Sequence, residues 1–364
     1  MQSENDAKNQ PEHLTLINNP PEETKIDFQT QDIPIENHQD TTNIDLFDLN
    51  TPLSNELIKL DSSLGIVGYA MQYIQPHSLF IVGTKDGCLL IYDPTNFSLI
   101  KKLTNIHSDK WIISLYYCQA LDLLFTTSTD RIIKVFKFNN SQGIEEIAKM
   151  EGHKDSVNGI LYIPEQNVLV SIGRDPNLKV WDAKTFTLKG EIETQGGGMG
   201  CLIIRMEDLK DCVGVSFATG KIKFFNIVTG ECVLCIETNS GNNNYYINSL
   251  LYLPKRKWIV AQISANQIKI WEKGQEGWSE RGVIKTEGHA NYVWIDEKEE
   301  TLVCACDKPF LDVFDLGSLL RKNKIQFAQT PLKNSNGLVY VKELGKVVIS
   351  AWNSPHLYIL KISE

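Results

Sequence analysis

The chain has 364 residues, of which 42% are hydrophobic and 22% charged, as in a soluble globular protein with one large or two ordinary domains. Its apolar runs are far shorter than the roughly 20 residues of a membrane helix, and its polar, acidic N-terminus predicts neither a signal nor a transit peptide. The net charge of −9 lies entirely in residues 1–50, which contain eleven acidic residues and two lysines. The charge-balanced remainder argues against nucleic acid as a main ligand, because such binding neutralises phosphates.

Residues 1–52 are predicted to form a disordered acidic tail, because a segment so rich in polar residues buries too little surface to offset its ordering entropy. The stretch NIDLFDLN places Ile44, Leu46, Phe47 and Leu49 among acidic residues. An acidic-hydrophobic island of this kind is able to dock into a partner's groove. The alternative that it packs on the protein's own body, or has no role, stays open.

Seven short apolar runs recur after the tail at intervals of 43 to 46 residues. Their key residues are Tyr92, Phe136, Trp181, Phe225, Trp271, Phe314 and Leu360. Further apolar runs surround each of them, separated by Gly, Asn, Asp and Pro. Self-similarity at this period indicates an array of one supersecondary unit, and the short β-rich runs predict that each unit is a small antiparallel sheet.

The units open with stretches such as GHKDSV (from Gly152), GHANYV (from Gly288) and IHSDKW (from Ile106), and close with WD, YD, WE or FD. Over about residues 57–364 the chain therefore resembles the WD-repeat family of β-propellers. The resemblance implies an all-β fold: a seven-bladed β-propeller of four-stranded antiparallel blades, closed by an N-terminal strand. The expected propeller spans residues 53–364, with blades near 66–103, 104–150, 151–194, 195–239, 240–286, 287–328 and 329–364 and a closing strand over 56–62.

The closing strand is expected because the last unit ends at its third apolar run, HLYILKISE. The segment NELIKLDSSLG (Asn55 to Gly65) is similar to the fourth-strand segment FSLIKKLTN (Phe97 to Asn105). We expect Leu57 to Leu60 to pair beside residues 357–363, because closure removes an open sheet edge.

The third unit contains the three residue types of a hydrolase triad, Ser171, His153 and Asp175. Ser171 stands in an apolar stretch, VLVSIG, and no G-x-S-x-G surrounds it, which argues against an exposed nucleophile. The resemblance implies a different role, in which these three residues and Trp181 form a structural hydrogen-bonded tetrad. A buried indole N–H needs an acceptor, and a hydroxyl accepts from it while donating onward to an imidazole.

The second unit repeats this set in part, with His107, Thr126, Asp130 and Phe136. A phenylalanine has no N–H to donate, so only the third unit is complete.

We expect neither a metal nor a cofactor. Cys232 and Cys235 are three residues apart on one strand and face opposite sides of the sheet, and Cys304 and Cys306 lie in a buried run. The glycine-rich stretches lack the residues of a phosphate-binding loop. Reduced thiols predict a cytoplasmic protein, with cytoskeletal or ciliary association left open.

The remaining chemistry is surface recognition. The resemblance implies a contact surface around the central channel, the channel face, formed by the turns between second and third strands and by the segments that lead into each first strand. Residues of hot-spot types at matching positions are Lys85, Trp111, Arg174, Tyr246, Tyr292, Trp294 and Trp352. The alternative for each ring is that it packs between blades.

The sequence thus predicts a non-enzymatic scaffold or adaptor that binds other proteins within a multi-subunit assembly. The alternative is a recognition propeller that binds a short peptide or modification through Arg174 and the aromatic residues. We expect protein partners, neither nucleic acid nor membrane, and a propeller that is itself monomeric.

Overall fold

A computed structural model describes residues 54–59, 70–139, 143–194, 200–238, 246–263, 266–275, 277–288, 290–326, 335–351 and 356–361. All of these belong to one compact unit, Leu46–Glu364. The predicted acidic tail, its island from Ile44 to Leu49, and Trp352 lie outside the described residues.

The described residues form seven four-stranded antiparallel sheets, each a blade of the fold. Blade 1 consists of β2 Met71–Ile74, β3 Leu79–Gly83, β4 Leu89–Tyr92 and β5 Leu99–Leu103. Blade 2 consists of β6 Ile112–Cys118, β7 Leu123–Ser128, β8 Ile133–Asn139 and β9 Gly143–Met150. Blade 3 consists of β10 Val157–Ile163, β11 Val168–Gly173, β12 Asn177–Asp182 and β13 Leu188–Glu193. Blades 4 and 5 consist of β14 Gly200–Arg205, β15 Cys212–Phe217, β16 Lys221–Asn226 and β17 Cys232–Glu237, and of β18 Ile247–Leu253, β19 Trp258–Ile263, β20 Gln267–Lys273 and β21 Trp278–Lys285. Blade 6 consists of β22 Ala290–Ile295, β23 Thr301–Cys306, β24 Phe310–Asp315 and β25 Arg321–Gln326, and blade 7 of β26 Ser335–Val341, β27 Lys346–Ala351, β28 His356–Lys361 and β1 Ser54–Lys59. Two 3-10 turns, η1 Gln75–His77 and η2 Lys342–Leu344, precede β3 and β27.

Burial follows the position of a strand within its blade. The second strand of blade 3, β11, is buried at every residue, because neighbouring blades cover both faces of the sheet. The fourth strand, β13, is mostly exposed, as expected for an outer edge. The sequence reflects this difference: β11 reads VLVSIG, whereas β13 reads LKGEIE.

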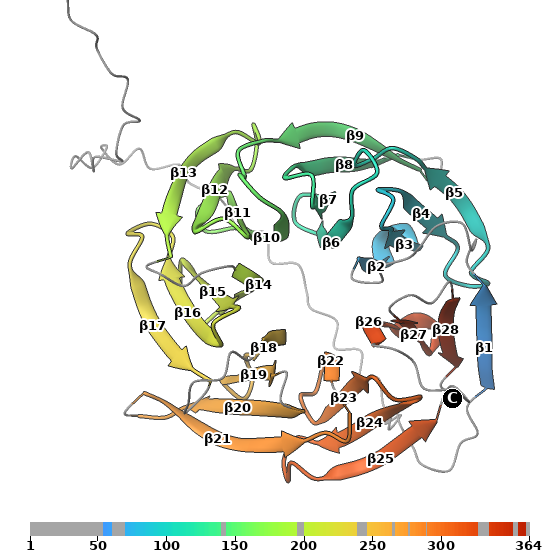
Figure 1. Cartoon of the computed structure of the whole chain (residues 1–364), viewed down its shortest axis with the longest axis vertical. Helices are drawn as coiled ribbons and strands as arrows, with labels where there is room; N and C mark the ends of the chain where they lie inside the picture. The colour runs from blue at the N-terminus through green and yellow to red at the C-terminus, as the bar shows by residue number, and fades with distance from the viewer. Residues whose placement is uncertain are drawn as a thin grey trace, which may run out of the picture. The chain divides into compact units, whose positions relative to one another are not determined.

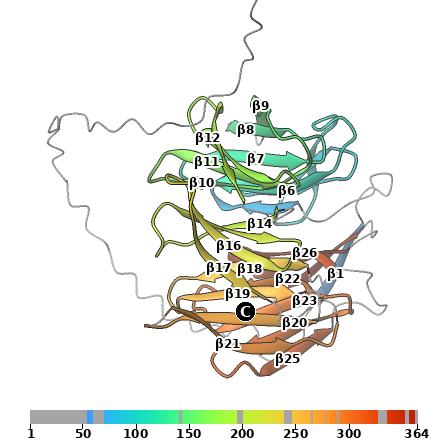
Figure 2. The same ribbon diagram turned by 60° about the vertical axis from the view of Figure 1, so that its left-hand side comes forward.

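The blades close into a ring (Figure 1). Each innermost strand contacts the innermost strand of the next blade, in the order β2, β6, β10, β14, β18, β22 and β26, and β26 contacts β2. The succession of β10, β14 and β18 is also visible in Figure 2. The described part of the chain is therefore a seven-bladed β-propeller, as the sequence predicts.

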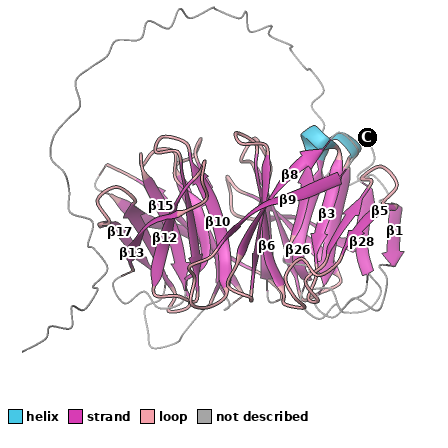
Figure 3. Ribbon diagram, turned by 90° about the horizontal axis from the view of Figure 1, so that it is seen from above, coloured by secondary structure: helices cyan, strands magenta, loops and turns pink. Residues whose placement is uncertain are grey.

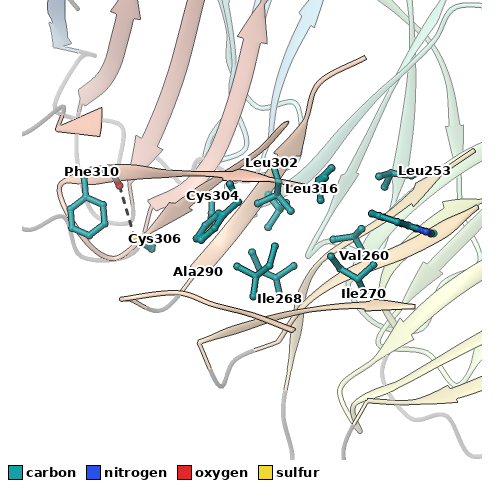
Figure 4. Close-up of a cluster of buried hydrophobic side chains, with 14 residues drawn as sticks. Leu253, Val260, Ile268, Ile270, Ala290, Leu302, Cys304, Cys306, Phe310 and Leu316 are labelled. Carbon is teal, nitrogen blue, oxygen red and sulfur yellow. Dashed lines mark hydrogen bonds between the residues drawn. The ribbon is translucent and has the colours of Figure 1, made fainter. Parts of the chain in front are cut away.

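Apolar side chains fill the space between neighbouring blades. Figure 4 shows the cluster between blades 5 and 6, in which Val260 and Ile270 of one blade pack toward Leu302 and Cys304 of the other. All four residues are at most 1% exposed. Each full burial of such a side chain contributes about 1.5–3 kcal/mol, so the interblade clusters are the main stabilising element of the ring.

Blade 7 takes its fourth strand from the N-terminal side of the chain. Strand β1 runs antiparallel to β28, with Leu57 opposite Tyr358 and Ile58 opposite Leu357. It spans residues 54–59, whereas the sequence predicted 56–62, of which residues 60–62 lie outside the described part.

Loops gather on two opposite sides of the ring, between which the strands run (Figure 3). The chain direction alternates within each blade, so turns between second and third strands lie on the same side as the connections to the next blade. This side is the channel face. In blade 1 its turn includes Gly87, whose φ of +71° favours glycine.

The opposite face is joined from blade to blade by polar contacts. His77 Nε2 of blade 1 lies 2.6 Å from Asp122 Oδ1 of blade 2. The hydroxyl of Tyr252 in blade 5 donates to Asp208 Oδ2 of blade 4 at 2.6 Å. Several charges on this face therefore serve blade-to-blade contacts.

Candidate functional site

The four predicted tetrad residues of blade 3 form one chain of hydrogen bonds. His153 Nδ1 lies 2.5 Å from Asp175 Oδ2, and His153 Nε2 lies 2.7 Å from Ser171 Oγ. Trp181 Nε1 donates to Ser171 Oγ at 2.8 Å. The carboxylate only accepts, so Nδ1–H donates to Asp175, and Nε2 of the neutral ring accepts from the Ser171 hydroxyl.

Burial decides what this arrangement is able to do. Ser171 is completely buried, so its hydroxyl is inaccessible to a substrate in this structure. Burial lowers the pKa of His153 to about 4, against the opposing effect of Asp175. The imidazole is therefore neutral at physiological pH and completes a chain of satisfied polar groups, which supports the structural interpretation over the hydrolase triad.

Blade 2 repeats the geometry without the last donor. His107 Nδ1 lies 2.8 Å from Asp130 Oδ2, and His107 Nε2 lies 2.7 Å from Thr126 Oγ1. Phe136 is 1% exposed and offers no N–H. Burial acts to raise the pKa of Asp130, but hydrogen bonds from His107 and the N–H of Ile132 lower it overall.

Three predicted contact residues lie on the channel face of blades 1 to 3. Lys85 is in the β3–β4 turn, and its Nζ lies 5.1 Å from the centroid of the Trp111 ring. Trp111 precedes β6 and is 41% exposed. Arg174 is exposed in the β11–β12 turn, where its N–H donates to the Ser156 carbonyl at 2.9 Å.

The other predicted rings separate into three groups. Tyr246, before β18, is 53% exposed, and Tyr292, on the innermost strand of blade 6, is 37% exposed. Trp294 packs edge-on against Tyr340 of blade 7, with 5.2 Å between ring centroids. Trp294 is therefore an interblade packing residue, which was the alternative for each ring. Trp352 lies outside the described residues.

An open hollow of about 470 Å³ lies on the channel face at the edge of blade 2. Its lining residues are Ser108, Lys110, Thr129, Asp130 and Arg131. The first two belong to the connection between β5 and β6, and the others to the β7–β8 turn.

The family described as "WD domain, G-beta repeat" (WD40) matches residues 144–182, which run from β9 through the Trp181-Asp182 pair of blade 3. This stretch contains the complete tetrad of blade 3. The fold consists of seven four-stranded blades, of which blade 3 is one. The chain is a WD-repeat propeller.

Curated relatives match parts of this sequence. Restriction of telomere capping protein 1 of Candida tropicalis is 23% identical over 216 residues, which are 56% of this chain and 18% of the relative. The DDB1- and CUL4-associated factor 11 homolog of Caenorhabditis briggsae is 22% identical over 127 residues, 34% of this chain and 23% of the relative. Nuclear distribution protein nudF 1 of Talaromyces marneffei is 36% identical over 63 residues, 17% of this chain and 13% of the relative. These matches span less than a quarter of each relative.

The described part of the propeller contains no group of three or more His, Cys, Asp or Glu side chains placed to hold a metal ion. Its eight cysteines are all free thiols. Burial raises the pKa of Cys304, in keeping with a small apolar role in β23.

Among the residues described, no helix has the length and apolar character to span a membrane.

Lys110 and Arg131 of the hollow were not among the predicted contact residues of the propeller. The prediction took the residue before each turn aspartate, which is Arg174 in blade 3 but Thr129 in blade 2. In blade 2 the basic residue follows Asp130 instead, so the signal was present but one position away on the other side of the aspartate.

Proposed function

We propose that this propeller is a non-enzymatic scaffold or adaptor that binds other proteins through its channel face. The observation that carries the proposal is the set of exposed hot-spot residue types on that face, namely Trp111, Arg174 and Tyr246. Trp, Tyr and Arg are the residues that most often dominate binding energy at protein interfaces.

The backbone at Trp111 is held in place. Trp111 N donates to Thr129 Oγ1 at 3.0 Å, and Thr129 N donates to the Trp111 carbonyl at 3.0 Å. These bonds join the connection into blade 2 to the β7–β8 turn. A backbone that is already ordered loses little conformational entropy when a partner binds, which favours affinity.

The relatives support the class of function. The name of the Caenorhabditis relative associates that protein with DDB1 and CUL4, that is, with other proteins. We extend only the class, protein binding, to this chain. A cytoplasmic site of action, a monomeric propeller and membership of one particular assembly stay predictions.

Proximity labelling in the native cell tests the proposal. The full chain is compared with a Trp111→Ala/Arg174→Glu variant and with a control that carries Lys184→Glu and Lys189→Glu. Both control lysines are exposed in blade 3 and lie in and after the β12–β13 turn, away from the channel face. We expect the channel-face variant to lose a set of labelled proteins that the control retains. Identical labelling in all three proteins, with melting temperatures unchanged, would contradict the proposal.

A chain without residues 1–52 is labelled in parallel. It shows which partners depend on the acidic segment and its island from Ile44 to Leu49, a docking role that stays a prediction. Partners lost from this chain alone are assigned to the segment and not to the propeller.

A further inference from the structure

We propose that the hollow on blade 2 binds an anionic side chain of a partner peptide, either a carboxylate or a phosphoryl group. This inference rests on the proposed function, since it names the chemistry that one part of the channel face recognises. It is carried by the five residues that line the hollow and by the bonds that hold them.

The walls present hydrogen-bond donors from both sides. Lys110 and Arg131 are exposed and contribute an ammonium and a guanidinium group. Ser108 contributes a hydroxyl, and Thr129 Oγ1 accepts from Trp111 N and keeps its own hydrogen as a donor. Two cations with two hydroxyls suit an oxyanion, because charge-assisted bonds to oxyanions are about twice as strong as neutral ones.

The acidic residue in the wall is already engaged by the protein. Asp130 Oδ2 faces His107 Nδ1 at 2.8 Å, and Asp130 Oδ1 accepts the N–H of Ile132 at 2.9 Å. Among nearby acids, Asp109 is exposed. Asp155 accepts the N–H of Ser156 at 2.6 Å, and this bond lowers its pKa, with smaller contributions from Arg174 and Arg131. Arg131 and Lys110 lie on opposite walls of the hollow.

The partial tetrad of blade 2 holds the two walls together. Its His107–Asp130 bond joins the segment that carries Ser108 and Lys110 to the turn that carries Arg131. Lys110 N also donates to the His107 carbonyl at 2.8 Å. The backbone of the two walls is thus in place before any ligand arrives, which lowers the entropic cost of binding.

The hollow has room for a side chain from a peptide. A volume of about 470 Å³ lies within the usual range of roughly 300–1,000 Å³ for ligand sites. Trp111, adjacent to Lys110 and 41% exposed, offers an apolar contact for a neighbouring residue of the peptide. A nucleic acid requires an extended basic stripe, and the charge-balanced propeller sequence favours a peptide instead.

The test uses the full chain and three fluorescein-labelled decapeptides with one Gly-Ala-Leu background and phosphoserine, glutamate or serine at the centre. Fluorescence anisotropy gives each affinity, with inorganic phosphate as competitor. We expect at least one anionic peptide to bind tenfold or more tightly than the serine peptide, and phosphate to compete with it. The tighter of the two anionic peptides identifies the source of the anion.

Lys110→Glu/Arg131→Glu is expected to abolish the preference for the anionic peptides, and the neutral Lys110→Gln/Arg131→Gln pair to reduce it at least fivefold. The matched control is Lys184→Glu/Lys189→Glu, which reverses two exposed charges outside the hollow and should retain the preference. Melting temperatures establish that every variant is folded.

Equal affinity for all three peptides, or equal loss in the hollow and control variants, would overturn the inference. So would tighter binding of a fluorescein-labelled single-stranded oligonucleotide of ten residues, lost on Lys110→Glu/Arg131→Glu, since it would assign the hollow to nucleic acid. The proposed function is tested separately from this inference. If the hollow variant keeps partners that Trp111→Ala/Arg174→Glu loses, the channel face still binds proteins but the hollow is not their anion site.

Discussion

Blades 2 and 3 each hold a histidine, an aspartate and a hydroxyl side chain in the same geometry, and they differ in the residue that ends the chain of bonds. In blade 3, Trp181 donates to Ser171. In blade 2, Phe136 occupies the corresponding place and the chain ends at Thr126. Both rings are 1% exposed and both blades form complete four-stranded sheets. The indole bond is therefore not needed to form a blade, and its contribution is to stability.

The other blades extend this comparison. In blade 3, Ser171 of the second strand pairs with Lys179 of the third strand. The residue at the equivalent position of the other five blades is neither a serine nor a threonine. It is Val82, Val215, Ala261, Cys304 and Ile349 in blades 1, 4, 5, 6 and 7. All five are at most 1% exposed and pack in the apolar clusters. Apolar burial is thus common to all seven blades, whereas among the described residues the hydrogen-bonded set is found in blades 2 and 3.

The two sets also differ in what surrounds them. Asp175 is 5% exposed and accepts the N–H of Lys154 with both oxygens at 3.0 Å. Asp130 lies in the wall of the hollow. Blade 3 therefore uses its polar set for stability, and we expect blade 2 to use the same set to hold a surface site as well.

The largest expected effect comes from removing β1, which pairs with β28 as the fourth strand of blade 7. A chain lacking residues 1–62 loses β1 and leaves β28 as an open edge. Its melting temperature should fall by about 10 °C or more, with hydrogen-exchange protection lost together in β7 and β11. A chain lacking residues 1–50 should melt like the full chain. Equal melting of the two truncated chains would show that β1 does not contribute to closure.

The next effect separates the two aspartates. Asp175→Ala leaves the His153 ring and the N–H of Lys154 without a buried acceptor, so we expect a loss of about 3 kcal/mol in the free energy of unfolding. Asp130→Ala should cost less, about 1–2 kcal/mol, because its surroundings admit water. Urea denaturation measures both. A larger loss at Asp130 would reverse the assignment of roles.

Acid should weaken blade 3 through His153. His153 has a pKa of about 4 in the folded chain and near 6.5 when unfolded, so below pH 6.5 the unfolded state binds the extra proton. Stability should fall by up to about 1.4 kcal/mol per pH unit from pH 6.5 toward 4, about 2 kcal/mol by pH 5. The pKa of Asp130 is lowered in the folded chain, so its contribution to stability is kept above pH 3.8, the pKa of an ordinary aspartate. This contribution is lost only as the pH falls through the lower pKa of the folded chain.

Urea titrations at pH 7, 6 and 5 measure this slope, and His153→Gln should remove it. An imidazole of His153 that titrates near 6.5 in the folded protein, followed by NMR, would contradict the prediction.

A smaller effect is expected when blade 3 is converted to the pattern of blade 2. Trp181→Phe removes the N–H that Ser171 accepts and leaves a small cavity, so we expect a loss of about 1–2 kcal/mol. The reciprocal Phe136→Trp should not give an equal gain, because the larger ring must enter a packed site. Urea denaturation of both variants gives the comparison. A loss at Trp181→Phe as large as that at Asp175→Ala would mean that the indole, and not the carboxylate, dominates the set.

The sequence predicted the architecture because the ring is built from local, repeated signals. Key residues such as Trp181 and Phe225 recur at a nearly constant interval, and each marks a third strand. The tetrad could be predicted because its members occupy fixed places within one unit. The hollow could not, because it depends on how the connection at Lys110 meets the turn at Arg131. Strand periodicity alone does not distinguish a ring that packs between blades, such as Trp294, from a ring on the channel face.

The smallest effect is the one expected on partner binding when the polar set of blade 3 is broken. Ser171 is completely buried, so Ser171→Ala should lower stability by about 1–3 kcal/mol and leave partner binding unchanged once the protein is folded. The matched variant in blade 2, Thr126→Val, removes the partner of His107 Nε2 and so loosens the wall of the hollow. It should weaken binding of the anionic peptide severalfold for a similar loss of stability. The anisotropy assay measures both variants at a temperature where each is folded. Equal binding by both variants would mean that the polar set of blade 2, like that of blade 3, serves stability alone. Ester hydrolysis that depends on Ser171 would overturn the structural assignment of the tetrad in blade 3.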